Sequence, residues 1–290
     1  ILSDSRIDVR LLVESALARV IEQMSTWEPC SHLSRFNRAA PDTWHTLPAE
    51  CFDVLSYALS LAHRTNGAYD PTIGALVNEW GFGSAGARAS VPPPEAIDAA
   101  RARTGWQRIQ IFPPERRVYQ PGGVEIDVAS IGKGFAVDHV ARTLEAHGLV
   151  HHLVEIGGEL RGAGCKADGS PWWVEIERPG LDVPRSLLVL HDLSVATSGD
   201  YRRYVESEGR RYSHALDPRT GWPIDNDLAS VTVLARECMQ ADALATALHV
   251  LGLEQGMAFA RDYGIAAIFR ERQSDSLVEH LSPATQPYLD

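Results

Sequence analysis

Cysteine is scarce in this sequence and follows no pattern. The four cysteines among the 290 residues are far apart and include no C-x-x-C pair. That spacing argues against a structural zinc site, and four cysteines are too few for a disulfide scaffold in a chain of this length. We therefore interpret Cys30, Cys51, Cys165 and Cys238 as free or buried thiols.

Clusters of positive charge and long apolar runs are also absent. The formal net charge is -11, and no run of lysine or arginine interrupts the acidic balance. Nucleic acids and anionic membrane surfaces both require a basic face, so we expect neither as a partner. No apolar run approaches the ~18 residues of a membrane span. No signal peptide is recognisable, but the chain begins at Ile1 rather than Met, so an export signal could have been removed.

The apolar residues that are present predict an α+β fold, with mixed or antiparallel sheets and flanking helices. Helical spacing and capping signals predict helices at 6–25, 48–66, 94–104, 131–147, 239–251 and 254–263. Short apolar runs between glycine turns predict strands at 107–112, 117–120, 124–128, 151–156, 172–178, 186–191, 228–235 and 265–270. Helices do not alternate strictly with strands, which is typical of α+β proteins. No linker is obvious, so we expect a single domain over residues 1–290.

The stretch from Gly81 to Gly86 matches the G-x-G-x-x-G fingerprint of dinucleotide-binding folds. That fingerprint requires a strand before it and a helix after it. Here a helical stretch precedes it and prolines follow, so we interpret it as a plain loop.

Asp242 and Thr246 are the first pair with a chemical signature. They are four residues apart on an apolar helical segment, so their oxygens lie on one helix face. Hard oxygen ligands of this kind suit Mg²⁺. The alternative is a surface aspartate beside a threonine that bonds its own helix backbone.

Residues 125–135, with the sequence E-I-D-V-A-S-I-G-K-G-F, form the second chemical feature. A strand is expected to end here and a helix to begin, and backbone N–H groups at such a junction can bind phosphate. Lys133, one of only two lysines in the chain, could reach the same phosphate. The alternative is an ordinary strand-to-helix turn with a lysine that faces solvent.

Three further segments end in glycine turns, and each is weak alone. They are V-E-I-G-G-E at 154–159, A-T-S-G-D-Y at 196–201 and Y-S-H-A-L-D-P-R-T-G at 212–221. His214 in the third could act as a base, orient a phosphate or bridge backbone groups.

Taken together, these segments resemble the FAD:protein FMN transferase (ApbE) family. The resemblance covers residues 24 to about 252, and its motifs follow in the family's order. They are M-S-T-W and S-H-L-S-R-F-N within 24–37, G-A-Y-D-P-T-I-G-A-L-V-N-E-W-G-F-G at 67–83, I-D-V-A-S-I-G-K-G-F-A-V-D at 126–138, V-E-I-G-G-E-L at 154–160, T-S-G-D-Y at 197–201, H-A-L-D-P-R-T-G at 214–221 and A-D-A-L-A-T-A-L at 241–248.

The resemblance implies an α+β, Mg²⁺-dependent enzyme that binds FAD and transfers FMN to a threonine or serine hydroxyl of an acceptor flavoprotein, with release of AMP. It also implies a periplasmic or inner-membrane-associated location, with membrane contact only through a removed lipoprotein anchor. By resemblance, the FAD-contacting positions are Trp27, Ala68, Tyr69, Asp70, Asp127, Lys133 and Ala215. The metal positions are Ser130, through its backbone carbonyl, Asp242 and Thr246. His214 is at the place of the family's essential histidine and is the expected catalytic residue.

The sequence departs from the family pattern at three points. The usual Met-Gly-Thr segment before the first helix has no counterpart, the usual double glycine is Ala129-Ser130, and residue 245 is Ala where some relatives carry a second acidic group. Two alternatives remain open. One is an FAD pyrophosphatase that uses water as nucleophile and yields FMN and AMP, and the other is a non-catalytic flavin-binding protein.

Overall fold

The computed structural model describes residues 7–88, 90–176, 186–201, 203–207, 209–273 and 276–288. By its internal contacts the chain divides into two compact units. The first unit comprises Ile1–Ala18, Ser130–Tyr201 and Asn226–Asp290, and the second comprises Arg19–Ala129 and Arg202–Asp225. The expectation of one domain over the whole chain stays a prediction.

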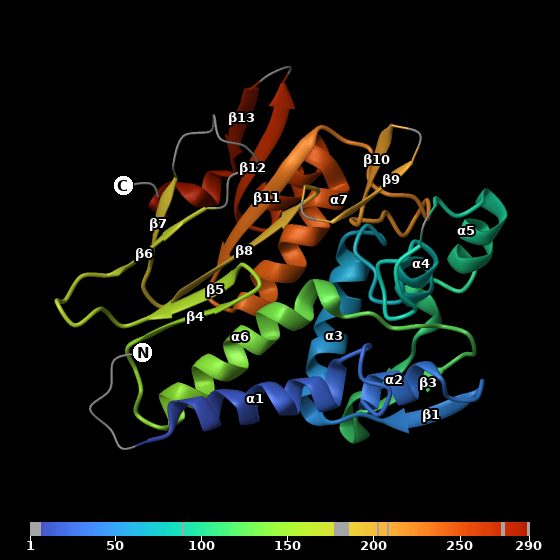
Figure 1. Ribbon diagram of the computed structural model, residues 1–290, viewed down its shortest axis with the longest axis horizontal. Coiled ribbons are helices and arrows are strands. Elements are labelled where there is room, and N and C mark those ends of the chain that lie inside the picture. The colour runs from blue at the N-terminus through green and yellow to red at the C-terminus, as the bar shows by residue number, and fades with distance from the viewer. Residues whose placement is uncertain are drawn as a thin grey trace. The chain divides into compact units, whose positions relative to one another are not determined.

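The first unit contains a six-stranded antiparallel sheet in the order β13-β12-β11-β8-β5-β4 (Figure 1). Its strands are β4 (His152–Ile156), β5 (Glu159–Ala163), β8 (Leu193–Gly199), β11 (Leu228–Ala235), β12 (Ala266–Gln273) and β13 (Ser276–Leu281). Strand β11 pairs with β8 on one side and with β12 on the other. Strands β4, β5 and β8 therefore share one sheet with β11, β12 and β13.

The two faces of this sheet are covered by different elements. Helix α7 (Cys238–Asp262) packs against β8 and β11 (Figure 1), and Ser198 faces it because its hydroxyl bonds His249. Val195, three residues away, therefore faces the opposite side. There it packs in one apolar cluster with the hairpin of β6 (Trp172–Glu175) and β7 (Leu187–Leu190). A short 3-10 helix, η3 (Pro283–Tyr288), follows β13.

Two further helices complete the core of the first unit. Helix α6 (Ala129–Ala146) presents an apolar stripe at helical spacing. Its residues Val137, Val140, Ala141 and Leu144 are buried with Ala16 of α1 (Val9–Met24), and other apolar side chains of α1 pack against the same cluster. The burial of this seam stabilises the position of α6, whose N-terminal end carries Lys133.

The second unit is mainly helical. Its elements are α2 (His32–Asn37), β1 (Thr43–Thr46), α3 (Ala49–Arg64), α4 (Gly74–Glu79), α5 (Pro94–Arg101), η1 (Trp106–Arg108), β2 (Ile111–Phe112), η2 (Pro113–Glu115), β3 (Arg117–Gln120), β9 (Tyr204–Ser207) and β10 (Arg210–Ser213). Strands β1, β3 and β2 form one antiparallel sheet, and β9 and β10 form a hairpin. The core includes Trp80, which is fully buried and whose indole N–H donates to the carbonyl of Gly221 at 2.9 Å.

The fold class is confirmed, and so are most of the predicted elements. The predicted strand at 124–128 is wrong. Its backbone makes only an isolated bridge to Ile73, while the N–H and carbonyl of Ile126 bond the side-chain amide of Asn37, both at 2.8 Å. A side chain thus replaces the partner strand that a sheet would have supplied.

Other boundaries differ for local reasons. Of the predicted strand at 107–112, only Ile111–Phe112 pairs as a strand, and a 3-10 turn occupies Trp106–Arg108. The predicted break between the helices at 239–251 and 254–263 is confirmed, because the backbone of α7 is non-helical at Gly252, where φ is 77°. The Gly81–Gly86 stretch follows helix α4 and forms turns, so its interpretation as a loop is confirmed.

Candidate functional site

Asp242 of helix α7 lies against Gly134 of helix α6. Its side chain is buried, and Oδ2 accepts the backbone N–H of Gly134 at 2.9 Å. A Cβ at position 134 would lie 2.3 Å from the carbonyl oxygen of Cys238, so only glycine fits there. The G-K-G segment of α6 therefore brings a backbone donor directly onto the α7 carboxylate.

The two remaining metal candidates follow from the same helix geometry. Ser130 precedes Gly134 by four residues on α6, and Thr246 follows Asp242 by four residues on α7. Side chains four residues apart share a helix face, so Ser130 lies on the α6 face that contacts α7, and Thr246 extends the Asp242 face. Both are half-buried.

Lys133 is adjacent to two carboxylates. Its ammonium forms an ion pair with Glu159, the first residue of β5, and lies 3.9 Å from Oδ1 of Asp242. The Glu159 side chain is 2 % exposed, whereas that of Lys133 is 46 % exposed. The cluster therefore has two buried carboxylates, those of Glu159 and Asp242, and one partly exposed ammonium.

The acids in this cluster have displaced pKa values. Burial raises the pKa of Glu159 to about 7, the charge of Asp242 adds to this, and Lys133 opposes it. Burial also raises the pKa of Asp242, against the effects of Lys133 and the Gly134 N–H. Burial lowers the pKa of Lys133, but the charges of Asp242 and Glu159 outweigh it and the net shift is upward. The cluster therefore disfavours two uncompensated negative charges.

A second aspartate, Asp138 of α6, contacts the N-terminal end of α7. This fully buried residue of α6 accepts the N–H groups of Cys238 at 3.0 Å and Met239 at 2.8 Å, the first two residues of α7. Arg161 of β5 pairs with it at 2.8 Å. Asp138 thus caps α7 while Asp242 of α7 accepts from α6, and this exchange fixes the relative register of the two helices.

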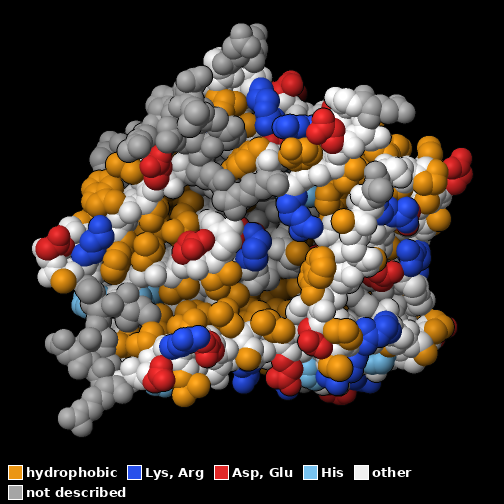
Figure 2. Space-filling view, in the orientation of Figure 1, with side chains coloured by type: hydrophobic (Ala, Val, Ile, Leu, Met, Phe, Trp, Pro, Cys, Tyr) orange, Lys and Arg blue, Asp and Glu red, His pale blue; other side chains and the backbone are white. Residues whose placement is uncertain are grey.

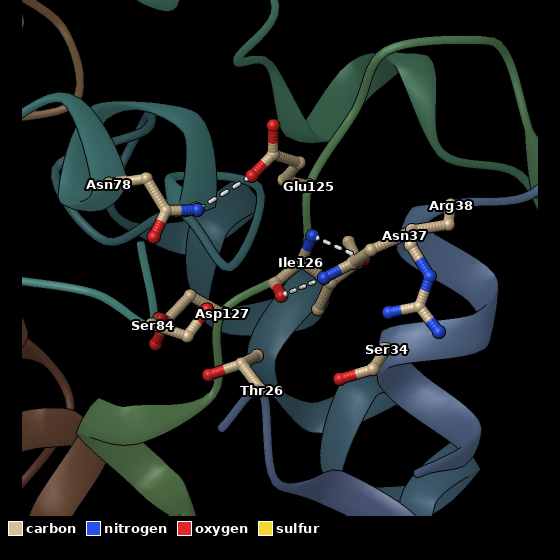
Figure 3. Close-up of a pocket in the computed structure, with 10 residues that line it drawn as sticks. Thr26, Ser34, Asn37, Arg38, Asn78, Ser84, Glu125, Ile126 and Asp127 are labelled. Carbon is tan, nitrogen blue, oxygen red and sulfur yellow. Dashed lines mark hydrogen bonds between the residues drawn. The ribbon is translucent and has the colours of Figure 1, made fainter. Parts of the chain in front are cut away.

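The second unit contains a polar cavity of about 290 Å³, shown in Figure 3. Its ten lining residues are Thr26, Ser34, Asn37, Arg38, Gly74, Asn78, Ser84, Glu125, Ile126 and Asp127. The Asn37 amide and the Ile126 backbone lie in its wall, and Asn78 donates to Glu125 at 2.8 Å (Figure 3). The only one of the expected FAD contacts among these residues is Asp127.

Two expected FAD-contacting aspartates are engaged within the protein. Asp127 accepts the N–H of Ala129 at 2.7 Å and so caps the first turn of α6, and burial raises its pKa. Asp70 accepts the N–H and hydroxyl of Thr72 at 2.8 and 2.6 Å and the N–H of Trp106 at 3.0 Å. Burial raises the Asp70 pKa against these bonds. Both carboxylates therefore organise backbone turns.

The expected flavin-lining residues have contrasting exposures. Ala68 and Tyr69 are buried, whereas the Trp27 side chain is 61 % exposed. An exposed indole offers a flat apolar face on which a planar ring can stack. Trp27 therefore has the exposure that the expected stacking role requires, whereas Ala68 and Tyr69 are enclosed by the protein.

His214 is held by the backbone of Arg203. The ring nitrogen Nδ1 of His214 lies 3.0 Å from the carbonyl oxygen of Arg203. The backbone N–H of His214 donates to the same oxygen at 3.1 Å. A ring that donates from Nδ1 carries its lone pair on Nε2 when neutral. Phe82 packs against it edge to face at a centroid distance of 6.2 Å, and Ala215 beside it is buried.

The structure thus groups Ser130, Lys133, Asp242 and Thr246 on two helices of the first unit. Trp27, Ala68, Tyr69, Asp70, Asp127, His214 and Ala215 belong to the second. Glu159 and Asp138 were not among the predicted site residues, although both belong to motifs that resemble the family. The available signal for Glu159 in the sequence was an acidic residue directly after a double glycine.

The first-unit cluster fits a hard divalent cation. Oε2 of Glu159 is buried without a hydrogen-bond partner among the described residues, and the acids outnumber the single lysine. No three His, Cys, Asp or Glu side chains in the described part of the chain form a metal-binding group. A cation here would therefore need serine and threonine oxygens and further ligands from substrate or water.

On the face in Figure 2, lysine and arginine side chains are interspersed with acidic ones and form no continuous basic stripe. In the part of the chain that the structure describes, no helix is long and apolar enough to cross a membrane.

Comparison with known proteins defines the class. The match to the ApbE family extends over residues 4–269, and the chain belongs to that family. A FAD:protein FMN transferase of Vibrio cholerae is 40 % identical over 279 residues, which are 96 % of this chain and 83 % of that protein. A second protein of that name, from Klebsiella pneumoniae, is 35 % identical over 287 residues, 97 % of this chain and 82 % of its own length.

Solved structures of ApbE proteins are also similar to this chain. The flavin transferase ApbE from Vibrio cholerae matches with a TM-score of 0.91 and 39 % identity, over 99 % of this chain and 92 % of its own. The apo form of the Pseudomonas stutzeri flavinyl transferase ApbE matches with a TM-score of 0.90 and 39 % identity, over 99 % and 90 %. The resemblance inferred from the motifs is confirmed, and the protein is an enzyme of the flavin transferase type.

Proposed function

We propose that the protein transfers FMN from FAD to a threonine or serine hydroxyl of an acceptor flavoprotein, in an Mg²⁺-dependent reaction that releases AMP. The observation that carries the proposal is the contact of Asp242 with the N-terminal end of α6, within a chain that belongs to the ApbE family. The relatives named above as FAD:protein FMN transferases support the choice of FAD as donor.

In this proposal Ser130, Asp242 and Thr246 hold the Mg²⁺ ion. When bound, Mg²⁺ neutralises charge on the pyrophosphate oxygens and polarises the phosphorus that is attacked. Lys133 adds a positive point charge for the same oxygens. The acidic surplus of the cluster favours a cation over a bare anion, so the metal and the pyrophosphate bind best together.

We assign His214 to the acceptor side of the reaction. The acceptor hydroxyl oxygen forms the new bond to the FMN phosphorus, the bond between that phosphorus and the bridging oxygen breaks, and AMP leaves with the electron pair. His214 takes the hydroxyl proton at Nε2, the nitrogen that carries the lone pair when Nδ1 donates to the Arg203 carbonyl. Trp27 stacks on the flavin ring, and Asp70 and Asp127 keep the neighbouring turns in place.

One alternative remains. An FAD pyrophosphatase would use the same groups with water in place of the acceptor hydroxyl, yielding FMN and AMP. Membership of an enzyme family of transferases removes the non-catalytic flavin-binding protein from consideration. We also propose a periplasmic or inner-membrane-associated location, which fractionation of cells that produce the full-length protein would test.

Incubation with FAD, MgCl₂ and a candidate acceptor distinguishes the two activities. We expect the acceptor mass to increase by one FMN and AMP to accumulate in equal amount. Replacement of the acceptor threonine or serine by alanine should abolish the mass increase. Free FMN and AMP, with an acceptor that stays unmodified, would contradict the transferase proposal and support the pyrophosphatase.

A further inference from the structure

The V-E-I-G-G-E motif forms the tight connection between β4 and β5. Ile156 and Glu159 are opposite each other in the register of these strands, and Gly157 and Gly158 make the turn with φ of 65° and 102°. This turn places Glu159 in a buried position, although it is the first residue of its strand.

The turn also encloses the ion pair of Glu159 and Lys133. A Cβ at position 157 would lie 3.5 Å from Oε2 of Glu159 and 3.5 Å from Cδ of Lys133. The glycine backbone therefore passes directly over both side chains. A positive φ disfavours any other residue there, which accounts for the glycine on physical grounds.

The Lys133 ammonium lies near two carboxylates, those of Glu159 and Asp242. The ammonium contacts Glu159, whereas Oδ1 of Asp242 is 3.9 Å away and Oδ2 of Asp242 is bonded to Gly134. An ammonium in direct contact with Asp242 would occupy the oxygen that a metal ion requires, because both cations seek the same negative charge.

We propose that Glu159 is a positioning residue that holds the Lys133 ammonium away from Asp242 and so keeps Oδ1 of Asp242 accessible to a divalent cation. This inference rests on the proposed metal role of Asp242. It differs from a role of Glu159 as a metal ligand, because here Glu159 acts through Lys133. It also differs from a purely structural role. In the positioning role, loss of Glu159 weakens metal binding only when a charged Lys133 is present to compete with the metal.

Titration calorimetry with MgCl₂ alone, at pH 8, tests the inference on the full chain. Glu159→Gln keeps the side-chain shape but removes the charge that attracts Lys133. We expect its Mg²⁺ affinity to fall about 10- to 100-fold, the usual effect of losing a group that supports a metal ligand. Adding Lys133→Met to Glu159→Gln removes the competing ammonium and should restore the affinity of the unaltered protein.

Two further variants serve as controls for the Mg²⁺ titration. Glu254→Gln alters an exposed glutamate of α7 and should bind Mg²⁺ like the unaltered protein. Lys133→Met alone should bind Mg²⁺ at least as tightly as the unaltered protein, and it tests the inference even if Glu159→Gln fails to fold.

Equal Mg²⁺ affinity in Glu159→Gln and the unaltered protein would overturn the inference. So would a double variant that binds as weakly as Glu159→Gln, since Glu159 would then act on the metal directly, or weaker binding by Lys133→Met. Absence of Mg²⁺ binding by the unaltered protein would instead refute the metal site of the proposed function, and this inference with it.

Discussion

Among single residues, Asp242 is a buried candidate held by a backbone hydrogen bond. Its Oδ2 accepts a backbone N–H while Oδ1 remains directed to the Lys133 side. Asp242→Asn preserves an acceptor for Gly134 but removes the charge, so we expect Mg²⁺-dependent turnover to be lost with little change in thermal stability. Asp242→Ala should also lose about 1–3 kcal/mol of stability, because the buried Gly134 N–H is left unpaired. Turnover assays and thermal unfolding measure both effects. Full activity of Asp242→Asn at low millimolar MgCl₂ would show that the metal binds elsewhere.

His214 offers a second residue-scale prediction. If it accepts the proton of the attacking hydroxyl, His214→Ala should slow single-turnover FMN transfer by about 10²–10⁴-fold and leave FAD affinity largely intact. The competing account makes it a bridge to the Arg203 carbonyl that holds its own loop in place. That account predicts weaker FAD binding and near-normal transfer at saturation, so both quantities must be measured on the same variant.

Glu159 predicts a pH dependence of stability. Its pKa in the folded protein is raised from 4.5 to about 7, so the folded state binds this proton more tightly than the unfolded state. Its contribution is complete below about pH 4.5 and is lost as the pH rises through about 7, with a limiting slope of about 1.4 kcal/mol per pH unit. Urea unfolding in EDTA between pH 4.5 and 8 should therefore show a smaller decline for Glu159→Gln. Equal pH slopes in the variant and the unaltered protein would contradict the shift.

At the scale of elements, the α6–α7 contact decides where the candidate residues lie. The two helices exchange caps, with Asp138 on the first N–H groups of α7 and Asp242 on Gly134. The apolar seam between α6 and α1 supports this contact from behind. The site geometry therefore depends on close helix packing as much as on the site residues themselves.

Gly134→Ala tests this dependence. The added methyl would lie 2.3 Å from the Cys238 carbonyl oxygen and 2.8 Å from Cβ of Asp242, so the helices must separate. We expect a loss of about 1–3 kcal/mol, as for other overpacked cores, together with weaker Mg²⁺ binding. Denaturant unfolding and calorimetry measure the two effects. Unchanged stability and metal affinity would show that the helices can separate without cost.

At the scale of the whole molecule, the residues assigned to the reaction predict a ligand of two parts. The proposed function assigns the flavin to the exposed Trp27 and the phosphates to Lys133. FMN lacks the pyrophosphate and NAD lacks the flavin, so we expect FAD to bind more tightly than either. Calorimetry with the three ligands in MgCl₂ tests this order. Equal or tighter binding of NAD would contradict the flavin assignment.

The elements that local pattern controls were largely predictable. Helices α3, α5, α6 and α7 and strand β11 agree with the predicted segments because their periodicity and capping are local signals. The 124–128 strand failed because Asn37, about ninety residues earlier, supplies its hydrogen bonds. Strands β1, β5, β8, β9, β10 and β13 and helix α2 were missed because they are short or are stabilised mainly by pairing and packing with their neighbours.

The α+β class, the family and the candidate residues could be predicted before the structure, because the order and spacing of motifs are properties of the chain alone. The sequence also identified Gly157 and Gly158 as turn residues, since glycine tolerates positive φ. Three features became visible only in the folded chain: Glu159 pairs with Lys133, Asp138 caps α7, and position 134 requires glycine. Each of those contacts joins segments 26 to more than 100 residues apart, and their distances follow from helix and sheet packing, which no local pattern encodes.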